Sequence, residues 1–287
     1  MSEDFTITST VTLNNGVEME RFGLGVWQAE NGEATPAVAA AIKNGYRLID
    51  TAKAYGNEAD VRTGIEQGIA EAGIAREDLF ITTKLANPDH GYDSTLTNFE
   101  GSLERLGLDY VDLYLIHWPV TGKYKDTWKA MEKIYDQGLA KAIGVCNFNQ
   151  ETMEDLLTDA NIVPAVDQIE LHPLLQQPDM VQYADDHNIH LEAWSPLGGG
   201  KVLNNPVIGQ IAAKYGKSAA QILIRWSLQM GFTVIPKSVH EQRIIENAQV
   251  FDFALTKEDM DLIATLDEHY RTSYWLTSFD WYTGDAK

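Results

Sequence analysis

The sequence has one cysteine, few basic residues and no long apolar run, and each absence excludes a class of protein. The single cysteine, Cys146, cannot form an internal disulfide, which agrees with a reducing compartment. Lys and Arg number 22 against 42 Asp and Glu, so the net charge is −20 and there is no basic surface for nucleic acid or anionic membranes. No run of about 18 apolar residues occurs, and the N-terminus has no signal-peptide pattern. We therefore expect a cytoplasmic protein that binds neither nucleic acid nor membrane.

What remains is the composition of an ordinary folded protein, with 44% hydrophobic and 22% charged residues. A chain of this length buries roughly 75% of its extended-chain surface on folding, so its core needs no disulfide or metal. No Ser-, Pro- or Gly-rich linker interrupts the sequence, and we expect one domain spanning residues 1–287. The large negative charge favours a monomer, since like-charged copies repel one another.

Short apolar runs alternate along the chain with segments of helical spacing. Eight runs are almost continuously apolar, which is typical of parallel strands buried on both faces. They span residues 23–27, 46–50, 79–83, 111–117, 142–145, 165–169, 190–194 and 233–235. Eight strand–helix units of about 30 residues, with one extra helix in the last gap, predict a (β/α)8 TIM barrel. A doubly wound sheet would need a glycine-rich phosphate loop after its first strand, and that loop is missing.

Additional elements are predicted at both ends of the chain. Alternating residues at 5–8 and 11–13, a turn at 14–16 and a run at 17–19 predict an N-terminal β-hairpin. Near Thr256 a capping pattern begins an extra C-terminal helix, which runs to about Leu266. The tail after it is too rich in aromatic residues for a disordered extension, so we expect an aromatic loop that closes over the site. The aromatic residues are Tyr270, Tyr274, Trp275, Phe279, Trp281 and Tyr282.

Charged side chains stand where three neighbouring strands end. Asp50, Lys84 and His117 follow or finish the second, third and fourth predicted strands. In such barrels the active site lies at the carboxyl ends of the strands, so the three side chains converge on one mouth. Each alone could be structural, as part of an ion pair or as a core histidine, but together they favour a catalytic site. Other polar or aromatic residues at strand ends are Trp27, Asn147, Gln168, Glu170, His172, Trp194, Ser195, Lys237 and Ser238.

Tyr55 lies five residues after Asp50, close enough to point back into this mouth. A free phenol, with a pKa of about 10, is a poor acid at neutral pH. An ammonium at Lys84 would lower that pKa, and Asp50 would keep the ammonium charged. The three residues could then donate a proton near neutrality, while His117 hydrogen bonds the oxygen that receives it. This group predicts a site that reduces a carbonyl and lacks only a hydride donor.

A second group of residues indicates where such a donor could bind. Lys237, Ser238 and Arg243 lie between the last strand and the following helix, where two cations, a hydroxyl and a helix N-terminus suggest an anion site. The glycine-rich loop 195–201 follows the seventh strand and could offer backbone N–H groups to a phosphate. Both lie at the same end of the barrel as the acid group, so together they indicate a phosphorylated cofactor.

Over nearly its whole length the sequence resembles the aldo-keto reductase family. The matching segments are LGVW (24–27), GYRLIDTAKAYGNE (45–58), ITTKL (81–85), DYVDLYLIHWP (109–119), KAIGVCNF (141–148), VDQIELHP (166–173), AWSPLG (193–198) and IPKS with the Arg and Glu-Asn after it (235–247). Within the family the sequence resembles the bacterial branch of 2,5-diketo-gluconate reductases, on AWSPLG, QIELHP and the short loops. Cys146 departs from the serine that the family usually has beside Asn147. A thiol is a weaker donor, so we expect altered cofactor affinity, with the thiol itself buried and inert.

The resemblance implies an NADPH-dependent oxidoreductase that reduces aldehydes and ketones, with a small carbonyl compound as substrate. It implies a catalytic tetrad of Asp50, Tyr55, Lys84 and His117, in which Tyr55 is the general acid. The implied cofactor contacts are Asn147 and Gln168 on the carboxamide, Trp194 on the nicotinamide ring, Ser195, Leu197 and Gly198 on the pyrophosphate, and Lys237, Ser238, Arg243 and Asn247 at the adenosine end. Lys237 and Arg243 suit a 2′-phosphate, which favours NADPH over NADH. The implied substrate contacts are Trp27, His117, Trp118, Tyr274 and Trp275.

Three other functions stay open at this point. Lys84 could be the nucleophile of a Schiff-base aldolase, although that leaves the anion site unexplained. Asp50, His117 and His172 could serve a metal-dependent hydrolase, although the sequence has no HxH motif. The chain could also be a cofactor-binding redox sensor or regulatory subunit, which would not need the complete tetrad.

Overall fold

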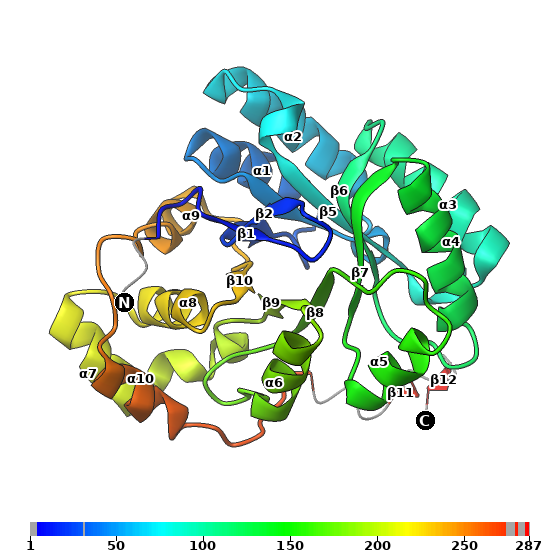
Figure 1. Ribbon diagram of the computed structural model, residues 1–287. Coiled ribbons are helices and arrows are strands. Elements are labelled where there is room, and N and C mark those ends of the chain that lie inside the picture. Colours follow the sequence, from blue (N-terminus) through cyan, green and yellow to red (C-terminus); the bar gives the residue numbers. More distant parts are fainter. Residues whose placement is uncertain (1–4, 31, 274–278, 281–284, 287) are drawn as a thin grey trace.

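Eight parallel strands form a barrel in the computed structural model, which describes residues 5–30, 32–273, 279–280 and 285–286. The strands are β3 (Gly23–Gly25), β4 (Leu48–Asp50), β5 (Phe80–Leu85), β6 (Val111–Ile116), β7 (Ala140–Cys146), β8 (Val166–Glu170), β9 (His190–Trp194) and β10 (Thr233–Val234). Neighbours in the sheet follow chain order, and bridges from Phe22 to Val234 and from Gly25 to Lys237 bring the first strand against the last (Figure 1). The predicted (β/α)8 barrel is confirmed.

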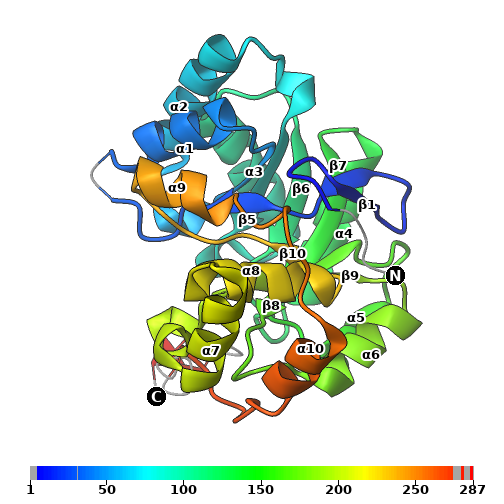
Figure 2. The same cartoon turned by 90° about the vertical axis from the view of Figure 1, so that its left-hand side faces the viewer.

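Helices surround the barrel (Figure 1), as the spacing of the apolar residues predicts. They are α1 (Ala34–Lys43), α2 (Glu58–Ala72), α3 (Tyr92–Leu106), α4 (Tyr124–Asp136), α5 (Gln150–Leu157), α6 (Pro178–Asp186), α7 (Pro206–Tyr215), α8 (Ala219–Gln229), α9 (Glu241–Asn247) and α10 (Lys257–Ala264). Both α7 and α8 lie between β9 and β10, which accounts for the long last gap. The extra C-terminal helix, α10, packs beside α7 (Figure 2), where Lys214 and Tyr215 hydrogen bond Asp259.

Short elements complete the described chain. The 3₁₀ turns are η1 (Lys53–Tyr55), η2 (Arg76–Asp78), η3 (Asn87–Asp89), η4 (Gly198–Gly200) and η5 (Val202–Asn204). Near the C-terminus β11 (Phe279–Asp280) and β12 (Asp285–Ala286) pair antiparallel. Both η1 and η4 follow strands of the barrel at their carboxyl ends, so these turns lie where the active site is expected.

A β-hairpin closes the amino-terminal end of the barrel. It consists of β1 (Thr10–Thr12) and β2 (Glu18–Glu20). Val11 stands opposite Met19, and Met19 is buried in one apolar cluster with inward-facing Leu48 of the barrel. The hairpin prediction is confirmed for these strands but wrong for residues 5–8, where Thr6 and Ser9 bond each other in a turn. Such local side-chain hydrogen bonds compete with strand pairing.

Inward-facing side chains change from apolar to polar along the strands. Leu48 on β4 and Val166 on β8 belong to the apolar layer beside the hairpin. Two residues further along each strand come Asp50 and Gln168, which face the same way because strand side chains alternate. The barrel therefore places a buried polar layer on top of an apolar one, at the end where barrel active sites lie.

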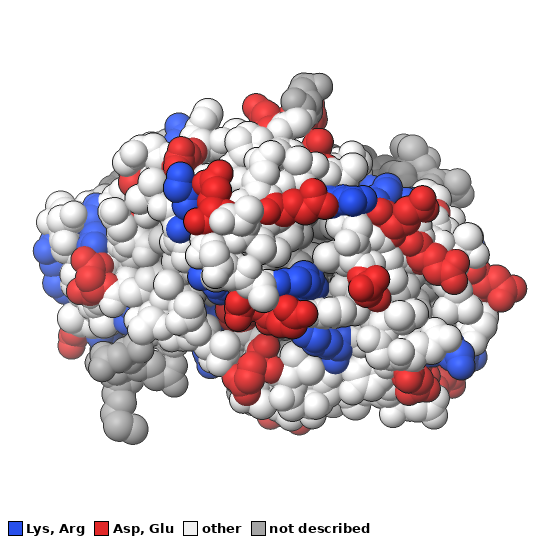
Figure 3. Space-filling view, turned by 90° about the horizontal axis from the view of Figure 1, so that it is seen from above, with Lys and Arg blue, Asp and Glu red and all other residues white. Residues whose placement is uncertain are grey.

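The surface carries charges of both signs. On the face shown in Figure 3, acidic and basic side chains are interspersed, and no continuous basic area is visible. No helix in the part of the chain that the structure describes is long and apolar enough to cross a membrane.

Gly144 on β7 permits the close approach of β8. A Cβ atom at this position would lie less than 3.0 Å from the Val166 carbonyl oxygen and 2.8 Å from Leu115 Cδ2. Both neighbours belong to barrel strands, so neither moves without disturbing close packing. The distance between β7 and β8 depends on this glycine. Asn147 follows β7 directly and Gln168 lies on β8, so their relative position depends on it as well.

We expect Gly144→Ala to destabilise the fold by about 1–3 kcal/mol, the usual cost of overpacking a core. Gly209→Ala is the matched control, because Gly209 lies within α7 and a Cβ there meets nothing within 4 Å. Alanine favours helix, so the control should gain up to about 1 kcal/mol. Urea unfolding of both variants measures the difference. A Gly144→Ala chain as stable as the wild type would contradict the packing argument.

Candidate active site

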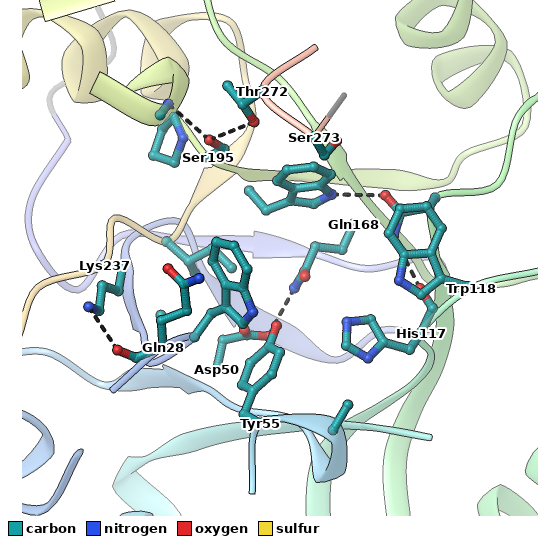
Figure 4. A pocket seen from close by; sticks show the side chains of 18 of the residues that line it. Gln28, Asp50, Tyr55, His117, Trp118, Gln168, Ser195, Lys237, Thr272 and Ser273 are labelled. Carbon is teal, nitrogen blue, oxygen red and sulfur yellow. Dashed lines mark hydrogen bonds between the residues drawn. The ribbon is translucent and has the colours of Figure 1, made fainter. Parts of the chain in front are cut away.

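A pocket of about 710 Å³ opens at the carboxyl ends of the barrel strands (Figure 4). Its wall contains many of the residues predicted for the site: Trp27, Asp50, Tyr55, His117, Trp118, Asn147, Gln168, Trp194, Ser195, Leu197 and Lys237. Lys84 is fully buried behind Asp50 and Tyr55, in contact with both. The barrel therefore brings the predicted acid group and much of the predicted cofactor group to one cavity.

The Lys84 ammonium lies at the centre of the buried polar layer. Its Nζ donates to Asp50 Oδ1 at 2.6 Å, to Asp50 Oδ2 at 2.7 Å and to the Thr51 carbonyl oxygen at 3.0 Å. Lys84 is 0% exposed and Asp50 2% exposed, so water screens neither charge. Burial disfavours the ammonium, but the negative charge of Asp50 and its hydrogen bonds to Nζ act in the opposite direction, and the pKa of Lys84 is raised. Lys84 therefore stays positively charged.

Tyr55 ends η1, directly after β4, and contacts Lys84. Its hydroxyl lies 3.3 Å from Lys84 Nζ, and its ring meets the His117 ring edge-on with centroids 5.6 Å apart. On the same turn, Lys53 contacts Asp89 and Asn98, which ties η1 to η3 and α3. These contacts fix the backbone from which the phenol projects.

Burial raises the pKa of Tyr55 above that of a free phenol. Lys84 lowers this pKa, as predicted, while Asp50 raises it, and burial is the largest effect. The expectation that the surrounding charges bring the pKa of Tyr55 below that of a free phenol is therefore wrong. Tyr55 stays protonated at neutral pH and can give its proton only to a base stronger than phenolate.

His117 follows β6 and lines the pocket beside Tyr55 (Figure 4). Burial and the positive charge of Lys84 lower the pKa of His117 to about 3. The imidazole is therefore neutral at physiological pH, with one ring nitrogen as a donor and the other as an acceptor. It can orient a polar group in the pocket without adding a charge.

Gln168 connects Asp50 to a second buried carboxyl group. Its Nε2 donates to Asp50 Oδ2 at 2.9 Å and to Glu192 Oε2 at 2.8 Å, which engages both amide hydrogens. Burial and the nearby Asp50 raise the pKa of Glu192 to about 8. The sequence analysis did not single out Glu192, although its inward position two residues before Trp194 was a usable signal.

Asn147 links two other predicted site residues, His117 and Trp194. It stands directly after β7 with a left-handed backbone (φ 62°). Its Nδ2 donates to the His117 carbonyl oxygen at 3.1 Å, and its Oδ1 accepts from Trp194 Nε1 at 2.9 Å. Cys146 beside it is fully buried, and burial raises the pKa of its thiol. A buried protonated thiol is unreactive, which supports the expectation that Cys146 is inert.

The predicted anion group is brought to the pocket only in part. Lys237 lines it, and its Nζ donates to the Gln28 carbonyl oxygen at 3.2 Å (Figure 4). The Ser238 hydroxyl instead bonds the backbone of His240. Gly198, Ser238, Arg243 and Asn247 are not part of the pocket wall, whereas Gly199 and Gly200 are.

The C-terminal segment reaches the pocket through two residues that the sequence analysis missed. Thr272 and Ser273 both line the cavity (Figure 4). The predicted substrate residues Tyr274 and Trp275 lie outside the described residues. The sequence offered one sign that these two residues reach the pocket, because they directly precede Tyr274 and Trp275, which were predicted to contact the substrate.

The residues considered for a metal site do not form one. Within the described ranges, no group of three or more His, Cys, Asp or Glu side chains is placed to hold a metal ion. His172 instead hydrogen bonds Glu170, with 3.1 Å between His172 Nε2 and Glu170 Oε1.

Comparisons with known proteins agree with this geometry. A sequence model of the Aldo/keto reductase family matches residues 20–268. A glyoxal reductase of Bacillus subtilis is 57% identical over 267 residues, which are 93% of this chain and 95% of that protein. The uncharacterized oxidoreductase YtbE of the same organism is 55% identical over 275 residues, 96% of this chain and 98% of that protein.

Solved structures give the same result. The Bombyx mori aldo-keto reductase in complex with NADP superposes with a TM-score of 0.89 at 34% identity, covering 98% of this chain and 99% of that one. An aldo/keto reductase from Brucella melitensis has a TM-score of 0.86 at 48% identity, covering 91% of this chain and 100% of that one.

Buried histidines make the fold sensitive to acid. Burial lowers the pKa of His90 to about 4 and that of His190 to about 3, as it does for His117. In the unfolded chain a histidine titrates at about pH 6.5, so below that pH the unfolded state binds more protons than the folded state. Stability is therefore lost as the pH falls from about 6.5 towards the folded-state pKa values.

Replacing His90, whose two ring nitrogens have no hydrogen-bond partner within the described residues, should reduce this sensitivity. We expect His90→Leu to lose about 2 kcal/mol less stability than the wild type between about pH 7 and about pH 5. His240→Gln, at an exposed position, is the control and should follow the wild type. Urea unfolding at several pH values is the measurement. Equal pH dependence in wild type and His90→Leu would show that His90 is not neutral in the fold.

Proposed function

The chain belongs to the aldo/keto reductase family, and from this premise we propose that it reduces aldehydes and ketones to alcohols with NADPH, Tyr55 acting as the proton donor. The contact of Lys84 with both Asp50 and Tyr55, behind a pocket that also holds His117, carries this proposal. We further propose that residues 1–287 form one domain and act as a monomer, without nucleic acid or membrane partners.

The residues of the pocket suit a nicotinamide dinucleotide. Both amide hydrogens of Gln168 are engaged, so its Oε1 remains as an acceptor. Asn147 Nδ2 donates one hydrogen to His117 and keeps a second. One acceptor and one donor complement a carboxamide, which has one of each. When bound, such a cofactor would supply the hydride that reduces the carbonyl carbon.

The phosphate groups would lie toward Lys237, the only Lys or Arg in the pocket wall as far as the described residues go. We propose that Ser195, Leu197 and Gly198 line the pyrophosphate and that Lys237, Ser238, Arg243 and Asn247 hold the adenosine end. Trp194 would stack on the nicotinamide ring. The Bombyx mori aldo-keto reductase was solved in complex with NADP, which supports a cofactor of this kind.

Tyr55 would provide the proton that the carbonyl oxygen needs. The neutral His117 imidazole donates a hydrogen bond to that oxygen and orients it beside the phenol. As the oxygen becomes an alkoxide it is a stronger base than phenolate, so the proton moves from Tyr55 to it. Lys84 stabilises the resulting phenolate, and Asp50 keeps the ammonium in place. Addition of one hydride and one proton converts C=O to CH–OH.

The geometry disfavours the aldolase alternative. A Schiff-base nucleophile must lose its proton, whereas the charges around Lys84 raise its pKa and the side chain is fully buried. A cofactor-binding sensor remains the second hypothesis, and NADPH binding without turnover of any carbonyl would favour it.

The substrate class is proposed from the relatives and from the pocket. A relative named glyoxal reductase makes α-dicarbonyls the first compounds to test. The resemblance to 2,5-diketo-gluconate reductases adds diketo sugar acids. Trp27, Trp118 and the start of the tail would contact either class, together with Tyr274 and Trp275.

Tyr55→Phe should lower kcat by about 10²–10⁴-fold, because it removes the proton donor, and should leave NADPH affinity unchanged. Tyr92→Phe, at an exposed position on α3, is the matched control. NADPH oxidation with an α-dicarbonyl and NADPH binding by fluorescence titration measure the two effects. Turnover retained in Tyr55→Phe would exclude the acid role.

Lys237→Met should raise KM for NADPH by about tenfold or more, because it removes a charged partner of the proposed 2′-phosphate. KM for NADH, which has no such phosphate, should change little. Steady-state rates with each cofactor give the ratio, and Lys257→Met on exposed α10 controls for the loss of one positive charge. An equal effect on both cofactors would place the 2′-phosphate elsewhere.

A further inference from the structure

Glu170 is a buried carboxyl group that the proposed mechanism does not use. It ends β8 and is 1% exposed. Its Oε1 accepts hydrogen bonds from the backbone N and the hydroxyl of Thr272, both at 2.6 Å. Its Oε2 accepts from the Ser273 hydroxyl at 3.1 Å. One carboxylate thus binds two consecutive residues of the C-terminal segment.

Hydrogen bonds stabilise the charge of Glu170. Besides Thr272 and Ser273, the carboxylate contacts His172, whose Nε2 lies 3.1 Å from Glu170 Oε1. Burial acts to raise the pKa of Glu170, but the hydrogen bonds from His172 and Thr272 outweigh it and lower the pKa. If residues 272–273 moved away, a buried carboxylate would lose three of its four donors, which is unfavourable.

Thr272 connects Glu170 to the glycine-rich loop at residues 195–200. Its hydroxyl lies 3.4 Å from Ser195 Oγ (Figure 4), and a Cβ at Gly199 would lie 3.3 Å from its methyl carbon. Ser195, Gly199, Thr272 and Ser273 all line the pocket. The residue that Glu170 binds therefore also contacts the loop, and the two chain segments form one part of the pocket wall.

We propose that Glu170 is a positioning residue, which fixes the start of the C-terminal tail against the 195–200 loop and thereby shapes the part of the pocket wall that these two segments form. Tyr274 and Trp275, proposed above as substrate contacts, follow the anchored residues directly in the sequence. The kinetic consequence rests on the proposed reductase function, whereas the anchoring itself does not.

Hydrogen exchange of the Thr272 backbone N–H tests the anchor without ligand or turnover. Glu170→Gln keeps the size of the side chain but replaces a charged acceptor by a neutral amide. We expect the Thr272 amide to exchange about tenfold faster in this variant. Glu268→Gln is the matched control, since Glu268 is an exposed carboxylate in the same segment, and should leave this rate unchanged.

Substitutions of Thr272 test the other side of the same contact. Thr272→Val removes the hydroxyl that bonds Glu170, and Thr272→Ser retains it. We expect Thr272→Val to raise KM for the carbonyl substrate by about 3–10-fold with kcat within about threefold, and Thr272→Ser to restore the wild-type value. Glu170→Gln should raise this KM by a similar factor. The double variant Glu170→Gln, Thr272→Val should have the same KM as Glu170→Gln alone, because both substitutions break the same contact.

Two results would overturn the proposal. One is an unchanged exchange rate at Thr272 in a folded Glu170→Gln chain. The other is faster exchange throughout the barrel strands with kcat and KM altered together, which would mean a role in stability alone. If Glu170→Gln does not fold, exchange and KM in the two Thr272 variants decide the matter. Absence of turnover in the wild type would contradict the reductase proposal, and hydrogen exchange would still test the anchor.

Discussion

The ion pair between Asp50 and Lys84 is the constraint on which the functional end of the barrel depends. Two opposite charges without solvent contact are stable only when both keep their partners, and loss of one partner from such a pair costs about 3–5 kcal/mol. Every donor hydrogen of Lys84 is directed to Asp50, Thr51 or Tyr55. The pair therefore fixes Asp50 at the carboxyl end of β4, Tyr55 at the end of η1 and Lys84 on β5 relative to one another.

The alternation of inward-facing and outward-facing side chains along the strands explains how the Asp50–Lys84 pair is buried in the barrel. Inward-facing residues near the hairpin are apolar and fill the amino-terminal end of the barrel. The polar residues two positions further along the strands therefore pack on an apolar layer that excludes water. Gln168 then extends the network from Asp50 to Glu192 on the opposite side of the barrel interior. Because both amide hydrogens of Gln168 face carboxyl groups, the orientation of its amide is determined, and the oxygen is the atom left for another partner.

Much of this arrangement could be predicted from the sequence. Apolar runs of regular spacing predict the eight strands, and residues that end those runs, such as Asp50 and His117, identify the pocket. The contacts of Thr272 with Glu170 could not be found in this way, since they join positions 102 residues apart and only Glu170 follows a predicted strand. The pKa of Tyr55 was mispredicted for a related reason, because the sequence shows which charges are near but not how deeply the phenol is buried.

Burial raises the pKa of both Tyr55 and Glu192, and both changes affect the proposed transfer of the Tyr55 proton. With its pKa raised to about 8, Glu192 is mostly neutral at pH 7, so Lys84 has one buried anion beside it, Asp50. Transfer of the Tyr55 proton places a second anion, the phenolate, next to the same ammonium. An ionised Glu192 would add a third negative charge in a region of low dielectric and would oppose that transfer. The neutral state of a carboxyl group that does not line the pocket thus favours the proposed proton donation by Tyr55.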